Sequence, residues 1–154
     1  MFLRRALALN LVMLLPASHV TGQSVHDDSL ALLLAPGPEP FMSYAMIGRI
    51  TSLNPTDIAA IEISDSGDIT DVFVRMEPEA TADFAEWTEI ATGFPLSVSI
   101  CDMRVLEATV QAPVTTGTIY IPNLNAVQAE ALRALWHGRQ TCSDIPAEVF
   151  PDGP

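Results

Sequence analysis

Residues 93–110, GFPLSVSICDMRVLEATV, contain two alternating apolar runs that meet at a short polar break. Apolar and small polar residues alternate through residues 96–100, so one side of this strand is buried and the other faces away. Asp102 suits a turn, whereas Met103 does not suit a left-handed backbone, so the loop is expected to be wider than two residues. The stretch predicts an antiparallel hairpin with Cys101 at its tip.

Strand-forming residues also occupy 42–50, 57–65 and 69–76, and Asn, Pro, Ser, Gly and Asp stand between these runs. The period then changes to that of a helix, which starts near Pro78 among acidic residues and stops at Gly93. Its apolar side repeats at spacings of four, three and four. The residues on that side are Ala80, Phe84, Trp87 and Ala91.

Beyond the hairpin, residues 118–121 predict a short strand, and a second helix follows. Asn125 and Gln128 form a capping-box pattern at its start, and Gly138 ends it. The tail, residues 143–154, is expected to add a last short strand. The apolar side of the second helix consists of Val127, Ala131, Leu132, Leu135 and Trp136, and we interpret Trp87 and Trp136 as core anchors.

The order strand, helix, strand pair, short strand and helix predicts an α+β fold. The expected form is a ferredoxin-like two-layer sandwich, in which two helices cover one face of a mainly antiparallel sheet. A chain of 154 residues suffices for one such domain. We place this domain at residues 41–150, after an N-terminal lead and linker at residues 23–40 that is rich in proline near its end.

Residues 1–22 have the layout of a secretory signal peptide. Arg4 and Arg5 precede an apolar stretch, residues 6–15, and small and polar residues lead to an expected cleavage site near Gly22. The apolar stretch is too short for a membrane-spanning helix, which needs about 20 residues. We therefore expect a periplasmic or secreted protein with no stable membrane insertion after cleavage.

The chain is strongly acidic, with 19 Asp and Glu against 7 Lys and Arg and a net charge of −12. Such a surface repels phosphate backbones and anionic headgroups, which argues against nucleic acid and membrane surfaces as partners. Asp65, Asp68 and Asp71 surround Gly67 in SDSGDITD, but the stretch lacks a twelve-residue calcium loop and its closing glutamate. We interpret it as a turn and predict no metal site.

The two cysteines, Cys101 and Cys142, form an even count in a chain expected to enter an oxidising compartment, which favours a disulfide. Closing a loop of about 40 residues stabilises a fold by up to roughly 4 kcal/mol on the chain-entropy model. A redox-active pair is the alternative, but such pairs usually have C-x-x-C spacing. The disulfide would tie the hairpin to the end of the second helix.

No catalytic constellation is visible in the sequence. His26 lies in the lead and His137 closes a helix, and neither belongs to a zinc or serine-hydrolase motif. Asp83, Glu86 and Glu89 share a helix and are interpreted as a solvated acidic face. We predict no catalytic, cofactor-binding or metal-binding residues, no cofactor, and a protein that is not an enzyme.

Residues 72–135 resemble the head subdomain of the first periplasmic region of SecD, the membrane subunit that assists bacterial protein export. Both contain the same elements in the same order. A strand is followed by an acidic helix with a Phe and a Thr, and then by a pair of strands. A link that contains glycine leads to a short strand, and a capped helix with a Glu-Ala pair comes last. The matching residues here are Phe84, Thr88, Cys101 to Ala108, Thr116 to Tyr120, Asn125, Glu130 and Ala131.

The chain departs from the SecD pattern in three places. Met103 replaces a turn glycine, a proline after Ala108 is missing, and Asn123 to Asn125 replace a glycine and hydroxyl pair. It also has none of the transmembrane helices through which SecD couples proton movement to export, so it is not expected to pump. The resemblance implies a stand-alone version of a domain that touches unfolded polypeptides.

Three functions are left open. A non-enzymatic domain that binds extended polypeptide or an export-machinery partner should offer a free strand edge, or a groove flanked by apolar side chains. An enzyme of unrecognised type should have a deep pocket where two carboxylates, or a carboxylate and His137, converge. An assembly or inhibitor domain for one folded partner should have a flat patch that mixes apolar and acidic residues. The first is the favoured hypothesis.

Overall fold

A computed structural model describes residues 37–66 and 69–151. The expected signal peptide, residues 1–22, lies outside them, and so do residues 23–36 of the lead, with His26. The described residues all belong to one compact unit. No helix in this part of the chain is long and apolar enough to cross a membrane.

Seven antiparallel strands form two sheets. The four-stranded sheet has the order β2-β1-β5-β6, and the three-stranded sheet has the order β3-β4-β7. The strands are β1 (Met42–Met46), β2 (Arg49–Leu53), β3 (Ile58–Ser66), β4 (Ile69–Met76), β5 (Pro95–Ile100), β6 (Met103–Thr109) and β7 (Thr118–Leu124).

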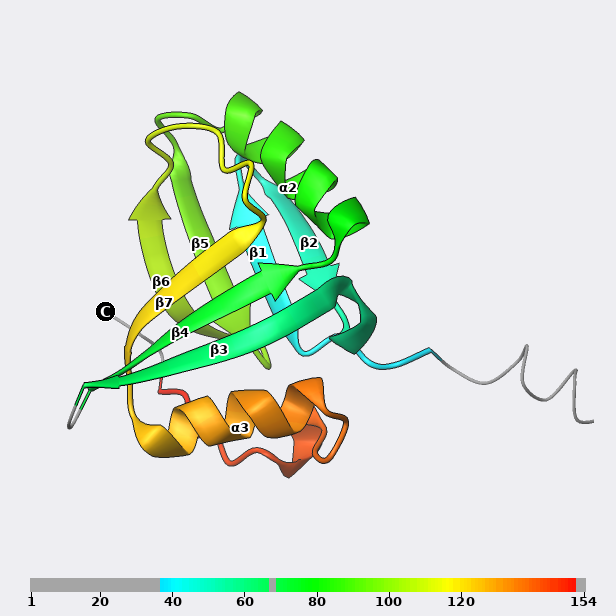
Figure 1. The fold of residues 1–154 in the computed structure, drawn as a ribbon, viewed down its shortest axis with the longest axis vertical. Coiled ribbons are helices and arrows are strands. Elements are labelled where there is room, and N and C mark those ends of the chain that lie inside the picture. Colours follow the sequence, from blue (N-terminus) through cyan, green and yellow to red (C-terminus); the bar gives the residue numbers. More distant parts are fainter. Residues whose placement is uncertain (1–36, 67–68, 152–154) are drawn as a thin grey trace, which may run out of the picture. The chain divides into compact units, whose positions relative to one another are not determined.

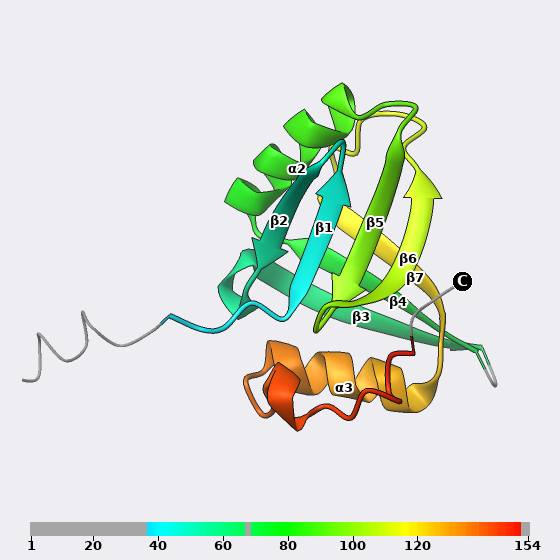
Figure 2. The same cartoon turned by 180° about the vertical axis from the view of Figure 1, so that it is seen from behind.

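The helices are α2 (Pro78–Ile90) and α3 (Ala126–Trp136), with 3-10 turns η1 (Pro55–Asp57) and η2 (Cys142–Asp144). The predicted α+β two-layer class is confirmed, since the described residues form two helices and two antiparallel sheets. The three-stranded sheet crosses the four-stranded sheet, and α2 and α3 lie at opposite ends of the two sheets in both views (Figure 1, Figure 2). A ferredoxin-like arrangement has one sheet, whereas this structure has two. No residue pattern in the sequence indicates this division.

The hairpin of residues 93–110 is tighter than predicted. Ile100 pairs with Met103, so the loop contains only Cys101 and Asp102, whose φ angles are 49° and 65°. Asp tolerates this left-handed conformation, and the amide of Cys101 donates a hydrogen bond of 2.8 Å to the carbonyl of Phe41. The prediction of a wider loop is wrong because the turn lies one residue earlier than the Asp102-Met103 pair suggested.

The stretch 42–50, predicted as one strand, is a second hairpin. β1 and β2 pair with each other through a two-residue turn at Ile47 and Gly48, with φ angles of 42° and 77°. Gly48 adopts this conformation without steric cost, whereas a β-branched residue such as Ile47 rarely does. The single-strand prediction is therefore wrong. Ile47 is an apolar, β-branched residue, so the sequence gives no turn signal before Gly48.

The helix ends follow the sequence signals. The side chain of Asn125 accepts a hydrogen bond from the amide of Gln128, and the side chain of Gln128 accepts one from the amide of Asn125, at 2.9 and 2.8 Å. Gly93 and Gly138 follow the two helices with φ angles of 88° and 64°, a conformation in which glycine is favoured. The predicted capping box and stop signals are confirmed.

The tail contains no strand among residues 143–151, which contradicts the prediction. It instead forms η2 and turns, and its apolar side chains enter the core. Phe150 is 0% exposed, and Ile145 is buried as well. Two prolines interrupt the tail, and proline removes the amide that a paired strand would need.

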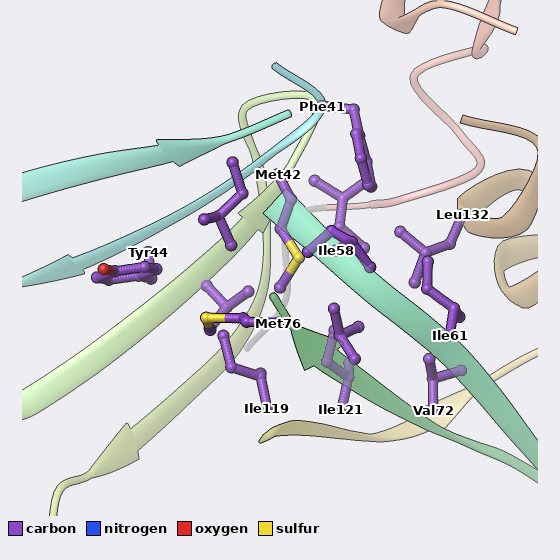
Figure 3. Close-up of a cluster of buried hydrophobic side chains, with 14 of the residues drawn as sticks. Phe41, Met42, Tyr44, Ile58, Ile61, Val72, Met76, Ile119, Ile121 and Leu132 are labelled. Atoms are coloured by element: carbon purple, nitrogen blue, oxygen red, sulfur yellow. The ribbon is translucent and has the colours of Figure 1, made fainter. Parts of the chain in front are cut away.

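The core lies between the facing sides of the two sheets. Figure 3 shows side chains from β1, β3, β4, β7 and α3 meeting in one cluster. The Phe84 ring of α2 meets the Tyr44 ring of β1 edge to face, with centroids 4.9 Å apart. Fully buried large side chains in this core include Phe84, Phe150, Ile100, Ile121, Leu132, Val72, Val74 and Val98.

A disulfide joins Cys101 to Cys142, whose Cα atoms are 5.2 Å apart and whose sequence separation is 41. It links the β5–β6 turn to the start of η2. The structure thus contains the bridge that the cysteine count favoured, and it holds the tail against the four-stranded sheet.

Thr88 is a buried polar residue with two hydrogen bonds. Its hydroxyl donates to the carbonyl of Ala85 at 3.0 Å and accepts from the amide of Val114 at 2.8 Å. The second bond fixes the chain between β6 and β7 to α2. Thr88 is 0% exposed, so if either hydrogen bond were lost, water could not reach the site to replace it.

Replacing Thr88 by valine is expected to lower the free energy of unfolding by about 1–3 kcal/mol, because the Val114 amide loses its acceptor while the side-chain volume is kept. Thr88→Ser keeps the hydroxyl and should cost only about 1 kcal/mol for the lost methyl group. Urea unfolding measures both. A serine variant less stable than the valine variant would contradict the role given to this hydroxyl.

Candidate functional site

The outer side of the three-stranded sheet carries an exposed aromatic pair. Val72 and Val74 of β4 point into the core, so Phe73 between them points outward. The register places Glu62 of β3, Phe73 of β4 and Tyr120 of β7 side by side. We call Glu62, Asp71, Phe73, Arg75 and Tyr120 together the aromatic face.

The two rings of the aromatic face are stacked, with centroids 5.1 Å apart and planes inclined by 27°. Phe73 is 36% exposed and Tyr120 is 45% exposed. Arg75 and Glu62 form an ion pair of 3.4 Å beside them. Because both charged side chains are exposed, this pair adds little stability and is easily exchanged for another. What distinguishes the two rings is that they are in contact with each other on the outer side of a sheet, so they form one continuous apolar surface.

Asp71 of the aromatic face contacts both Asn123 and Tyr120. It accepts a hydrogen bond of 3.4 Å from the Asn123 amide, and it interacts with the hydroxyl of Tyr120. Desolvation raises the pKa of the Tyr120 hydroxyl, and the hydrogen bond and the charge of Asp71 raise it further. Tyr120 therefore stays protonated at neutral pH and can act as a hydrogen-bond donor.

The aromatic face borders an unpaired strand edge. β3 pairs only with β4, so within the described part of the chain no strand pairs with its other edge, although α3 packs against β3 and β4 (Figure 1). The indole NH of Trp136 occupies the start of this edge by donating a hydrogen bond of 3.2 Å to the Ile58 carbonyl. Further along, Glu62 and Asp65 are exposed. Free edges are the sites where extended segments add to a sheet.

An apolar groove runs between α3 and the tail. Its volume is 510 Å³, within the range of about 300–1,000 Å³ that is usual for ligand sites. Glu130, at the groove, pairs with Arg139 and Arg133 at 3.0 and 3.6 Å, so its charge is already compensated. The lining residues are Ala126, Val127, Glu130, Ala131, Gln140, Ile145, Pro146 and Val149.

A smaller pocket, of 140 Å³, brings three carboxylates together beside Tyr44. These belong to Asp57, Glu79 and Asp83. Its volume is below the range usual for small-molecule sites, and the Asp57 carboxylate already accepts a hydrogen bond of 2.8 Å from the Asn54 amide. The His137 ring packs on Trp136 at 4.5 Å and does not line this pocket.

The acidic residues that the sequence placed on one helix are all exposed. Asp83, Glu86 and Glu89 lie on the surface of α2, as predicted for a solvated face, and Asp83 also lines the small pocket. Asp65 and Asp71 lie on the β3–β4 hairpin, and the Asp65 carboxylate accepts a hydrogen bond of 3.0 Å from Thr70. Within residues 37–66 and 69–151, no group of three His, Cys, Asp or Glu side chains is arranged to hold a metal ion.

The predicted core anchors are only partly buried. Trp87 packs under the guanidinium of Arg49, whose central carbon lies 4.0 Å from the ring centroid. This cation–π contact joins α2 to β2. Sequence reasoning missed Phe73 and Tyr120, although their outward register was readable from the buried valines on either side of Phe73.

No family model matches the chain, and no curated protein matches it. Among solved structures, the chain is similar to a membrane component SecDF that enhances protein export, at 19% sequence identity and a TM-score of 0.48. The likeness covers 76% of this chain and 69% of that chain. At this level it assigns neither a family nor a function.

Proposed function

We propose that this protein is an exported, non-catalytic domain of the protein-transport class that binds extended polypeptide at the β3 edge and the aromatic face. The observation that carries the proposal is the exposed Phe73–Tyr120 stack beside an unpaired strand. Strand edge and apolar surface lie together, as a segment that adds to a sheet requires. The site of action is the periplasm or the extracellular space.

Strand addition uses both parts of the site. Backbone groups of the client pair with the edge of β3, so that one client side chain extends the row of Glu62, Phe73 and Tyr120. Every second client side chain then lies on the same face of the sheet as this row. Backbone pairing is independent of sequence, which suits a protein that meets many clients. The resemblance of residues 72–135 to the SecD head subdomain supports a role in contact with unfolded polypeptides.

The proposal is tested with a short fluorescent peptide that alternates methionine and threonine, because the long, uncharged methionine side chain can reach across β3 to Phe73, and the protein used is the form in which the Cys101–Cys142 disulfide is present. Phe73→Ser is expected to weaken binding about tenfold, since loss of a central aromatic contact costs more than about 1 kcal/mol. Phe94→Ser is the matched control, because Phe94 is similarly exposed but lies outside the aromatic face. Fluorescence anisotropy measures both affinities.

A second peptide tests the backbone pairing. N-methylation at every second residue, on the edge facing β3, removes amide donors and should abolish binding. Absence of binding for the unmodified peptide, or equal binding by wild type and Phe73→Ser, would refute polypeptide recognition at this site.

A second candidate function is that of an assembly or inhibitor domain for one folded partner. It is favoured by the aromatic face itself, which mixes exposed rings with Glu62 and Asp71 on a flat sheet surface. A non-reducing pull-down from periplasm distinguishes the two functions. If a single folded protein is recovered, if Phe73→Ser abolishes its recovery, and if a competing peptide does not affect it, this function is favoured over strand addition.

A further inference from the structure

We infer that the aromatic face selects client segments that carry arginine, whose guanidinium stacks on Phe73 and pairs with Glu62. This inference rests on the proposed function and adds the chemistry of the preferred client. It follows from three features of the described residues: the orientation of the partly exposed Phe73 ring, the exchangeable ion pair of Glu62, and the charge of the protein.

The first feature is the orientation of the Phe73 ring. Tyr120 stacks on one side of this ring from β7, and β3 lies on the other side of β4. The second side of the ring is therefore turned toward the β3 edge, where a client strand would lie. Neighbouring strands are about 4.8 Å apart, so a client side chain must reach over Glu62 to contact Phe73. A long side chain such as arginine has that reach.

The second feature is the carboxylate between the edge and the ring. The side chain of Glu62 is 64% exposed and, among the residues that the structure describes, it is paired with Arg75 alone, at 3.4 Å. A client guanidinium that stacks on Phe73 lies beside this carboxylate and forms two parallel hydrogen bonds with it. Because the resident pair is exposed, exchanging Arg75 for a client arginine costs little.

The third feature is charge complementarity. The net charge of −12 and the absence of lysine attract cationic segments and repel acidic ones. The protein also forms the same kind of contact internally, where the Arg49 guanidinium lies 4.0 Å from the centroid of the Trp87 ring. Arginine suits such a site better than lysine, because its planar group both stacks on a ring and pairs with a carboxylate.

The test compares three peptides that alternate valine with arginine, with lysine or with citrulline, the uncharged analogue of arginine. Anisotropy titrations at fixed ionic strength are expected to show the arginine peptide binding about tenfold more tightly than the citrulline peptide, which corresponds to roughly 1.4 kcal/mol. Lysine should be intermediate. Glu62→Gln should reduce the arginine preference, whereas Glu89→Gln, an exposed carboxylate on α2, should leave it unchanged.

The outcomes separate the two proposals. Equal binding of the arginine and citrulline peptides, with the Phe73→Ser defect intact, would overturn the arginine selection and leave polypeptide binding standing. Equal binding of arginine and lysine would show that charge alone is recognised and would also overturn it. Failure of all peptides to bind would overturn the proposed function itself.

Discussion

Replacing Phe150 by alanine is expected to lower the free energy of unfolding by about 3–5 kcal/mol, the range found for removing a buried phenylalanine ring. Phe150 is 0% exposed and belongs to the core cluster, although it lies only a few residues from the end of the chain. Its loss leaves a cavity between the tail and the core that the surrounding side chains fill only in part. Urea unfolding followed by tryptophan fluorescence measures the change.

Phe94→Ala is the matched control, because the same ring is removed from a position that is 52% exposed. It should change the unfolding free energy by less than about 1 kcal/mol. If both variants lost similar stability, the tail would not be packed as described, and Phe150 would not anchor it.

Breaking the Cys101–Cys142 disulfide is expected to cost about 4 kcal/mol on the chain-entropy model, because the bridge closes a loop with 41 residues of separation. Urea unfolding of the same protein with and without reductant gives the difference. The double variant Cys101→Ser and Cys142→Ser should match the reduced protein and should not respond to reductant. An unchanged midpoint on reduction of the wild type would exclude a stabilising role for the bridge.

The sequence predicted those parts of the fold that depend on local chemistry. Asn125 and Gln128 specify the start of α3 through hydrogen bonds within one turn, and Gly93 and Gly138 specify helix ends through their backbone freedom. The alternation in β5 likewise predicted its buried side. Such signals involve residues close in sequence, so they can be read without the tertiary structure.

The missed features depend on tertiary contacts. Ile47 occupies a left-handed turn position that its own propensity disfavours, and Phe150 is buried in a segment whose prolines suggest a loose tail. The outward pair of Phe73 and Tyr120 was missed for a related reason. The two rings are 47 positions apart in the chain and meet only because β4 and β7 pair.

The open edge of β3 also affects how copies of this protein meet one another. An unpaired strand is a template for any extended chain, including the same strand of a second molecule, and stacking of that kind leads to fibrils. Glu62 and Asp65 line this edge, so two identical edges brought together would oppose like charges. These carboxylates would therefore disfavour self-association through the β3 edge.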